Sequence, residues 1–162
     1  QRRGFEVAAV VDEILAMLSP QLRKRPLDVR EAIPAGLRLD SYPGPFGQVV
    51  ANLVNNAAIH AFDDGGRRGT IEIAAEAVGE DAVRLTIADD GAGIAPEHLD
   101  RIFDPFFTTR LGKGGSGLGL HIVYNIVSGV LGGSIRVDSE PGRGTRFTLE
   151  LPRVAPVPQA PE

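Results

Sequence analysis

The chain has 162 residues, of which 43% are hydrophobic and 23% are charged, so we expect a single globular domain with a sizeable core. Its formal net charge of −4 argues against a nucleic-acid partner, and the absence of cysteine excludes disulfides, thiolate metal sites and a cysteine nucleophile. No apolar run is long enough to cross a bilayer, and the first residues lack the features of a secretory signal.

The first part of the chain is predicted to form a helix, two strands and a second helix. Apolar residues at helical spacing predict a helix over residues 5–18, ended by the Ser-Pro pair that follows. Imperfect alternation predicts a strand over 27–33 and a short return strand over 37–39. A second helix is expected over 45–62, with an apolar face that begins at Phe46.

The remaining elements complete a fold of the α+β class. They are two strands at 70–77 and 82–88, a short helix at 96–102, a helix at 117–131 and two strands at 134–138 and 145–151. This order predicts a two-layer sandwich, in which one mixed, mostly antiparallel sheet of about five strands is covered by about three helices on one face. Residues 153–162 are rich in proline and alanine and are expected to form a tail outside the core.

A first candidate motif, NLVNNA, lies on the second helix. Asn52 and Asn56 are four residues apart and therefore share one helix face, and His60 lies four residues further on. Amide oxygens are suitable ligands for Mg²⁺, which keeps several waters and completes its shell with phosphate oxygens. The competing interpretation is a helix with polar surface residues, because so short a motif has little specificity.

A second motif, DDGAGI, directly follows a predicted strand. A carboxylate at a strand end, here Asp89, could accept a hydrogen bond from an exocyclic amino group such as that of adenine. Gly91 and Gly93 would let the backbone approach the base without a β-carbon in the way. The alternative is an ordinary polar turn, since Asp-Gly pairs are frequent in turns.

A third motif is the glycine-rich run at 112–119, which leads into the third helix. It formally matches the dinucleotide-binding pattern, but no strand precedes it, as that fold requires. It also fails the P-loop pattern, because Lys113 is not followed by Ser or Thr at the helix start. A glycine hinge joined to a phosphate-covering loop remains, with a flexible linker as the alternative. Three aromatic residues lie close together nearby, Phe103, Phe106 and Phe107. They indicate a loop that either docks on another surface or is simply anchored in the core of the domain.

In this order the motifs resemble the catalytic ATP-binding domain of sensor histidine kinases, within the GHKL group of ATPases. QVVANLVNNAAIHAF resembles the N box, DDGAGI the first glycine box, FDPFFTT the F box and GKGGSGLGLHIV the second glycine box. PGRGTRFTLELP resembles the closing hairpin of the family. The resemblance covers residues 5–152, and the ordered set is far more specific than any one box.

The resemblance implies ATP and Mg²⁺ as cofactors, with Asn56 as the metal ligand and Asp89 as the partner of the adenine amino group. It implies a lid at about residues 95–116, from which Arg110 or Lys113 contacts the terminal phosphates. It also implies that Thr145 lies near the carboxylate that binds adenine. The full set of residues implied to contact nucleotide is Asn52, Asn56, His60, Asp89, Gly91, Gly93, Ile94, Phe107, Arg110, Lys113, Gly115, Ser116, Gly117, Leu118, Gly119, Leu120 and Thr145.

The resemblance also implies partners outside this chain. None of His60, His98 and His121 lies in the helical hairpin that carries the phosphoacceptor of the family. The acceptor and its general base are therefore expected upstream, and residues 1–20 would be the leading helix from that dimerisation region. The chain does not open with Met, which also suggests a fragment of a longer protein. We expect the fragment to be a monomeric cytoplasmic domain, the whole protein a homodimer, and a response regulator the final acceptor.

Two alternatives remain at this stage. Hydrolysing GHKL members need a glutamate on the N-box helix, and residues 48–60 contain no acid, which leaves the anti-sigma-type serine kinases as the closer rival. A degenerate, non-catalytic nucleotide-binding module is the second rival. It gains weight from Ile59, because many kinases of this group carry a basic residue at that place.

Overall fold

The computed structural model describes residues 1–61, 68–107 and 119–158, and for His60 and Ala61 it describes the backbone only. A five-stranded sheet in the order β2-β4-β5-β7-β6 forms one layer. Strands β2 and β4 pair in parallel, and the other neighbours are antiparallel. The strands are β2 Leu27–Ala32, β4 Gly69–Val78, β5 Ala82–Asp89, β6 Ser134–Glu140 and β7 Gly144–Pro152.

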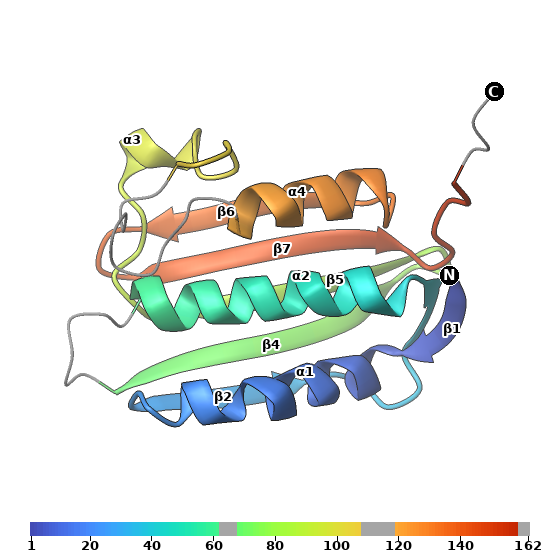
Figure 1. Ribbon diagram of the computed structural model, residues 1–162, viewed down its shortest axis with the longest axis horizontal. Coiled ribbons are helices and arrows are strands. Elements are labelled where there is room, and N and C mark those ends of the chain that lie inside the picture. The colour runs from blue at the N-terminus through green and yellow to red at the C-terminus, as the bar shows by residue number, and fades with distance from the viewer. Residues whose placement is uncertain (62–67, 108–118, 159–162) are drawn as a thin grey trace.

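Helices cover one face of this sheet and form the second layer (Figure 1). The long helices are α1 Val7–Leu22, α2 Pro43–Asn56 and α4 Gly119–Gly129, and the short helix α3 is Pro96–Leu99. Helix α2 lies between α1 and α4 and contacts both. The predicted α+β sandwich with a mixed, mostly antiparallel five-stranded sheet is confirmed.

The core lies between the helices and the sheet. Alternate residues of β4 and β5 are almost fully buried, among them Ile71, Ile73, Leu85 and Ile87, as period-two patterning requires. Helix α2 buries a face that contains Phe46, Val49, Val50, Leu53 and Val54, each 0% exposed. Burial on this scale stabilises the fold by roughly 25 cal/mol per Å² of apolar surface. Because one face of α2 is so deeply fixed, the polar residues along its flank have a defined direction.

A second, two-stranded sheet was not predicted. Strand β1 (Arg3–Glu6) pairs antiparallel with β3 (Arg38–Ser41), so helix α1 begins at Val7 instead of residue 5. Phe5 is 4% exposed and packs against Phe46 with ring centroids 5.5 Å apart. Here pairing between segments far apart in sequence overrides a helical pattern, which local spacing cannot reveal.

The predicted ends of two helices were also wrong. Helix α1 continues through Pro20 to Leu22, because the missing N–H affects only the last turn and Leu22 packs against the core. The second helix begins at Pro43, and its α-helical part ends at Asn56. A π-helical turn, η1 (Ala57–Ala61), then continues the chain, a feature that often occurs at functional sites.

The beginning of the predicted tail packs onto the small sheet. The N–H of Asp40 donates to the Arg153 carbonyl at 2.7 Å, and the N–H of Ala155 donates to the Asp40 carbonyl at 2.8 Å. Ala155 is 1% exposed, so the expectation that this segment stays outside the core was wrong for that residue. The division of the chain at residue 152 stays a prediction. Among the helices in the described ranges, none combines the length and apolarity needed to span a bilayer.

Candidate functional site

The site begins at the end of β5, where the second motif lies. Asp89 is the last residue of β5 and lies between Ile71 of β4 and Thr145 of β7 in the sheet ladder. Its Oδ1 accepts a hydrogen bond from the N–H of Gly91 at 2.9 Å. This hydrogen bond to its own turn fixes the orientation of the carboxylate. A group that hydrogen-bonds to the edge of a nucleotide base needs such a fixed orientation.

A hydroxyl network supports this turn from the neighbouring strand. Ser139 of β6 accepts the N–H of Ile94 at 2.8 Å and donates to the Gly144 carbonyl at 2.9 Å. Its Oγ also lies 2.9 Å from Oγ1 of Thr145, which is 8% exposed. Because the single Ser139 proton is directed at Gly144, Thr145 is the donor in that contact.

Ser139 was not among the predicted site residues. The available signal was strand periodicity, since Ile135, Val137 and Ser139 alternate with charged residues and therefore share the covered face of β6. A serine at the third position of such a series is a candidate for an inward-facing polar group.

Two glycines allow a close backbone approach at the same place. Gly93 has φ +78°, and a β-carbon there would overlap the carbonyl oxygen of Glu140. Gly144 has φ +99°, and its β-carbon would overlap the carbonyl oxygen of Asp89. The N–H of Gly142 also donates to the Ala92 carbonyl at 2.8 Å. The segment after β5 and the β6–β7 turn therefore form one closely packed unit.

The asparagine motif lies on the other side of the site. Asn52 and Asn56 are both half-buried on α2, and the π turn that follows Asn56 contacts β5. Within the described residues neither amide side chain makes a hydrogen bond. The same residues contain no group of three His, Asp or Glu that could hold a metal. Amide oxygens fit Mg²⁺ if phosphates and waters supply the rest of its shell, as that ion prefers.

The three phenylalanines of the F-box segment differ in their surroundings. Phe103 packs against Tyr124 and Phe147, with ring centroids 5.5 and 6.3 Å apart, and so anchors the segment to the core. The Phe107 ring contacts the tilted ring of His98, with centroids 5.4 Å apart, and the guanidinium of Arg101 lies over Phe107 at 4.6 Å from its centroid. Phe106 is 71% exposed.

Helix α4 begins with two of the predicted contact residues, Gly119 and Leu120, and holds a histidine contact that was not predicted. Nδ1 of His121 lies 3.2 Å from the Phe103 carbonyl, and Nε2 lies 3.2 Å from the Asn125 amide nitrogen. The tautomer protonated at Nδ1 satisfies both contacts, donating to Phe103 and accepting from Asn125. His121 thus ties the first turn of α4 to the F-box segment.

Several predicted residues cannot be placed in this geometry. The side chain of His60 lies outside the described part of the chain, as do Arg110, Lys113, Gly115, Ser116, Gly117 and Leu118. Of the others, the structure brings Asp89, Gly91, Gly93, Ile94 and Thr145 together in one unit. Asn52 and Asn56 lie on the adjacent helix, and Phe107 contacts the residues around α3.

The chain is similar to a family of ATPases and to named kinases. Residues 42–155 match the family described as histidine kinase-, DNA gyrase B-, and HSP90-like ATPase. Sensor histidine kinase ZraS of Salmonella typhimurium is 40% identical over 147 residues, which are 90% of this chain and 30% of that protein. Sporulation kinase A of Bacillus subtilis is 32% identical over 145 residues, or 89% and 23% of the two chains.

Solved structures agree with this relationship. The nucleotide-free catalytic domain of histidine kinase ThkA superposes with a TM-score of 0.82 at 30% identity, covering 95% of this chain and 97% of that one. ThkA in complex with the response regulator protein TrrA gives 0.76 at 28% identity, covering 94% and 42%. The chain spans less than a third of the length of the curated relatives named above. It belongs to the histidine kinase-, DNA gyrase B- and HSP90-like ATPase family, as a catalytic ATP-binding domain of the sensor histidine kinase type.

Proposed function

We propose that the chain binds Mg²⁺–ATP between α2 and the turn after β5, and that in the whole protein it donates the γ-phosphoryl group to a histidine. The observation that carries the proposal is Asp89, which ends β5 with its carboxylate held by the N–H of Gly91. An acceptor oriented in this way, with glycine backbone beside it, suits the amino edge of adenine. The π turn that follows Asn56 contacts β5, and in this proposal the phosphates extend from the base toward this end of α2.

Each site residue has a chemical part in this proposal. Asp89 accepts a hydrogen bond from the adenine amino group, and the hydroxyls of Thr145 and Ser139 keep the surrounding backbone in place. Asn56 is a ligand of Mg²⁺ with Asn52 beside it, and the ion neutralises charge on the phosphates when bound. The N–H groups at the start of α4, at Gly119 and Leu120, add the positive end of a helix dipole. Phosphoryl transfer depends mainly on such positioning and charge neutralisation.

The roles of the remaining predicted residues belong to the same proposal. Arg110 and Lys113 supply cationic contacts to the terminal phosphates, and the glycines of 112–119 act as the hinge of a lid. His60, Ile94 and Phe107 contact the nucleotide. Position 59 holds the half-buried Ile59 and not a basic side chain. The proposal therefore assigns more of the phosphate binding to Arg110 and Lys113.

The phosphoacceptor is proposed to lie outside this chain. His121 contacts Phe103 and Asn125, and the His98 ring packs against Phe107, so neither has the setting of an acceptor on a helical hairpin. The longer relatives are named sensor histidine kinases, and one solved relative is a complex with a response regulator. We therefore assign upstream dimerisation helices and a response regulator receiver domain as partners. The whole protein is proposed to be a homodimer, with this domain monomeric and in the cytoplasm.

Calorimetry with Mg²⁺ and a non-hydrolysable ATP analogue tests the binding step. The chain should bind the analogue, and Asp89→Asn should weaken binding at least about tenfold, because hydrogen bonds to charged groups contribute about 1.5–3 kcal/mol. Asp90→Asn is the matched control. Asp90 Oδ1 accepts the N–H of Thr70 at 2.8 Å, a bond that an amide oxygen can also make. Lack of binding by the unaltered chain would instead favour the degenerate module.

A transfer assay tests the kinase step and separates the remaining alternatives. With radiolabelled ATP the chain alone should form no stable phosphohistidine, and it should label the helical hairpin of its own parent protein when that is added. Rapid hydrolysis without an acceptor would favour the hydrolysing members of the family, against which the acid-free helix α2 argues. Acid-stable phosphoserine on a protein substrate would favour the serine kinases.

A further inference from the structure

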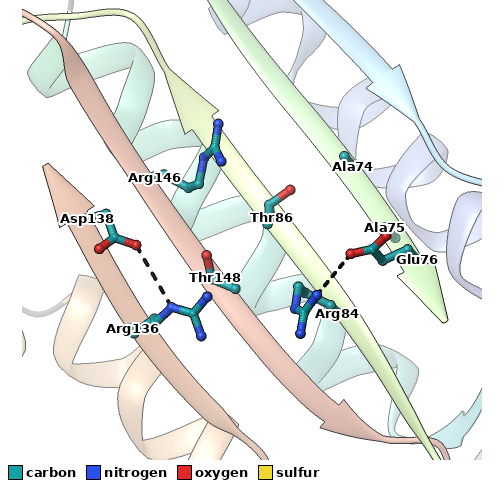
Figure 2. Close-up of a pocket in the computed structure, with 9 residues that line it drawn as sticks. All are labelled: Ala74, Ala75, Glu76, Arg84, Thr86, Arg136, Asp138, Arg146 and Thr148. Atoms are coloured by element: carbon teal, nitrogen blue, oxygen red, sulfur yellow. Dashed lines mark hydrogen bonds and ion pairs between the residues drawn. The ribbon is translucent and has the colours of Figure 1, made fainter. Parts of the chain in front are cut away.

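The sheet face turned away from the helices carries a hollow of about 410 Å³ that has no part in the nucleotide site. Its floor is built of small side chains that are neighbours in register across three strands, Ala74 of β4, Thr86 of β5 and Thr148 of β7. Longer charged side chains surround this floor (Figure 2): Glu76, Arg84, Arg136, Asp138 and Arg146. Three arginines and two acids leave this lining with a net charge of +1.

Thr148 is the first sign that the hollow suits a polar ligand. The residue is 3% exposed, and its hydroxyl makes no hydrogen bond to any residue in the described ranges; because the oxygen is not among the fully enclosed polar atoms, the hydroxyl opens onto the hollow. The side chain lies on the floor of the hollow, so the hydroxyl can donate a hydrogen bond to a ligand bound there.

The arginines of the lining differ in how their charge is used. Arg84 donates to Glu150 at 2.9 Å and to Glu76 at 3.0 Å, and so is neutralised by two carboxylates. Arg146 makes no hydrogen bond or ion pair within the described part of the chain, although Asp138 is its neighbour across the β6–β7 ladder. Its guanidinium is therefore available to an anion.

Arg136 provides a second cation next to the same hydroxyl. It lies directly opposite Thr148 in the β6–β7 ladder, and its Nε is 3.9 Å from Oδ2 of Asp138. That ion pair is long and uses only Nε, which leaves both terminal nitrogens of the guanidinium for another acceptor. Arg136 and Arg146 thus lie on either side of Thr148 along the β6–β7 side of the hollow, one across the ladder from it and the other two residues before it on the same strand.

We propose that this hollow is a second ligand site, which binds a small phosphate-bearing molecule through Arg136, Arg146 and the hydroxyl of Thr148. A phosphate group offers more acceptor positions than a planar carboxylate and so suits donors that approach from several sides. Thr86 adds a further hydroxyl to the floor. The site is independent of the ATP site, because strand alternation sends Arg146 to the outer face and its neighbour Thr145 to the covered face.

The test follows inorganic phosphate by backbone-amide NMR, with the 162-residue chain saturated with ADP so that the nucleotide site is occupied. Saturable shifts should concentrate on β6 and β7 around Arg136, Arg146 and Thr148. Arg146→Gln should weaken phosphate binding at least about tenfold, and Thr148→Val about threefold or more, since each removes one donor to a charged acceptor. ADP affinity should stay unchanged in both variants.

Arg30→Gln is the matched control. Arg30 lies on the same face of the sheet, beside Glu72 in register, but outside the hollow, so its loss removes the same charge from the same surface. It should change phosphate affinity by less than about twofold, because exposed charges are screened by solvent and salt. An equal effect of Arg30→Gln and Arg146→Gln would overturn the proposal, as would the absence of saturable shifts or wild-type affinity in Thr148→Val.

Discussion

The two sides of the nucleotide site are constructed differently. On the strand side, Asp89, Ser139 and Thr145 are tied together by side-chain and backbone hydrogen bonds, and glycines let two backbone segments touch. On the helix side, Asn52 and Asn56 make no such bonds within the described residues, and only the neighbouring buried face of α2 sets their direction. Stability and ligand binding should therefore be coupled on the strand side and separable on the helix side.

The largest effect is expected from Gly144→Ala on the strand side. It should destabilise the domain by about 3 kcal/mol, because it adds left-handed backbone strain to an overlap with the Asp89 carbonyl. Nucleotide affinity should fall as well, since the overlap displaces the end of β5. Urea denaturation and calorimetry with ADP measure the two quantities.

Gly142→Ala is the control for backbone strain. Gly142 lies in the same turn with φ +81°, but nothing would lie within 4 Å of its β-carbon. It should cost about 1 kcal/mol and leave ADP affinity unchanged. Equal costs for the two variants would mean that close packing against Asp89 contributes nothing.

A smaller effect on the same side is expected from Ser139→Ala. The change leaves the N–H of Ile94 and the hydroxyl of Thr145 without their shared partner, which should cost about 1–3 kcal/mol. The affinity for ADP should fall with it, because Ile94 follows directly on the glycine turn. Ser134→Ala, at an exposed position of the same strand, should change neither quantity. Unchanged ADP affinity in Ser139→Ala would break the proposed coupling.

Glu31→Gln tests stability on the edge strand β2, which contributes no residue to either side of the site. Partial burial of the carboxyl beside α1, together with a hydrogen bond to the Asp12 carboxyl and repulsion from it, raises the pKa of Glu31 from 4.5 to about 7. The folded state therefore binds this proton more tightly than the unfolded state. The stabilisation is complete below about pH 4.5 and is lost as the pH rises through about 7.

The neutral glutamine should remove that dependence. Glu31 is an exposed residue, and after allowance for solvent screening we expect Glu31→Gln to be about 1 kcal/mol more stable than the unaltered chain at pH 8. Near pH 4 the two should be equal, and ADP affinity should not change at either pH. Thermal unfolding between pH 4 and pH 8 measures the difference. If the stability of the two proteins depended on pH in the same way, the raised pKa of Glu31 would be ruled out.

The smallest effect on stability is expected on the helix side. Asn56→Ala should change the free energy of unfolding by less than about 0.5 kcal/mol, because the amide has no partner to lose in the described structure and alanine favours helix. Mg²⁺-dependent binding of the ATP analogue should nevertheless fall at least about tenfold. Asn55→Ala, one position round the helix, is the matched control and should bind normally. A large loss of stability in Asn56→Ala would show that the two sides are built alike.

Much of this arrangement could be predicted from sequence because it is local. Strand periodicity located β4, β5 and β7 to within a residue at each end, and the helical face of α2 was recognised from Phe46 onward. Asp89 was identified as a strand-end carboxylate before any contact was known. Ser139 was missed, because its importance depends on where β6 lies beside the turn after β5.

The sequence by itself determined the class of fold, the family and the type of chemistry, because hydrophobic period and motif order are properties of neighbouring residues. Tertiary structure alone decided the pairing of β1 with β3, the burial of Ala155 and the contacts of Ser139. It also decided which charged side chains of four strands meet around Thr148. Each of these depends on strand order and register between segments that lie far apart in the chain. A local sequence pattern does not specify which distant segments pair, or in which register.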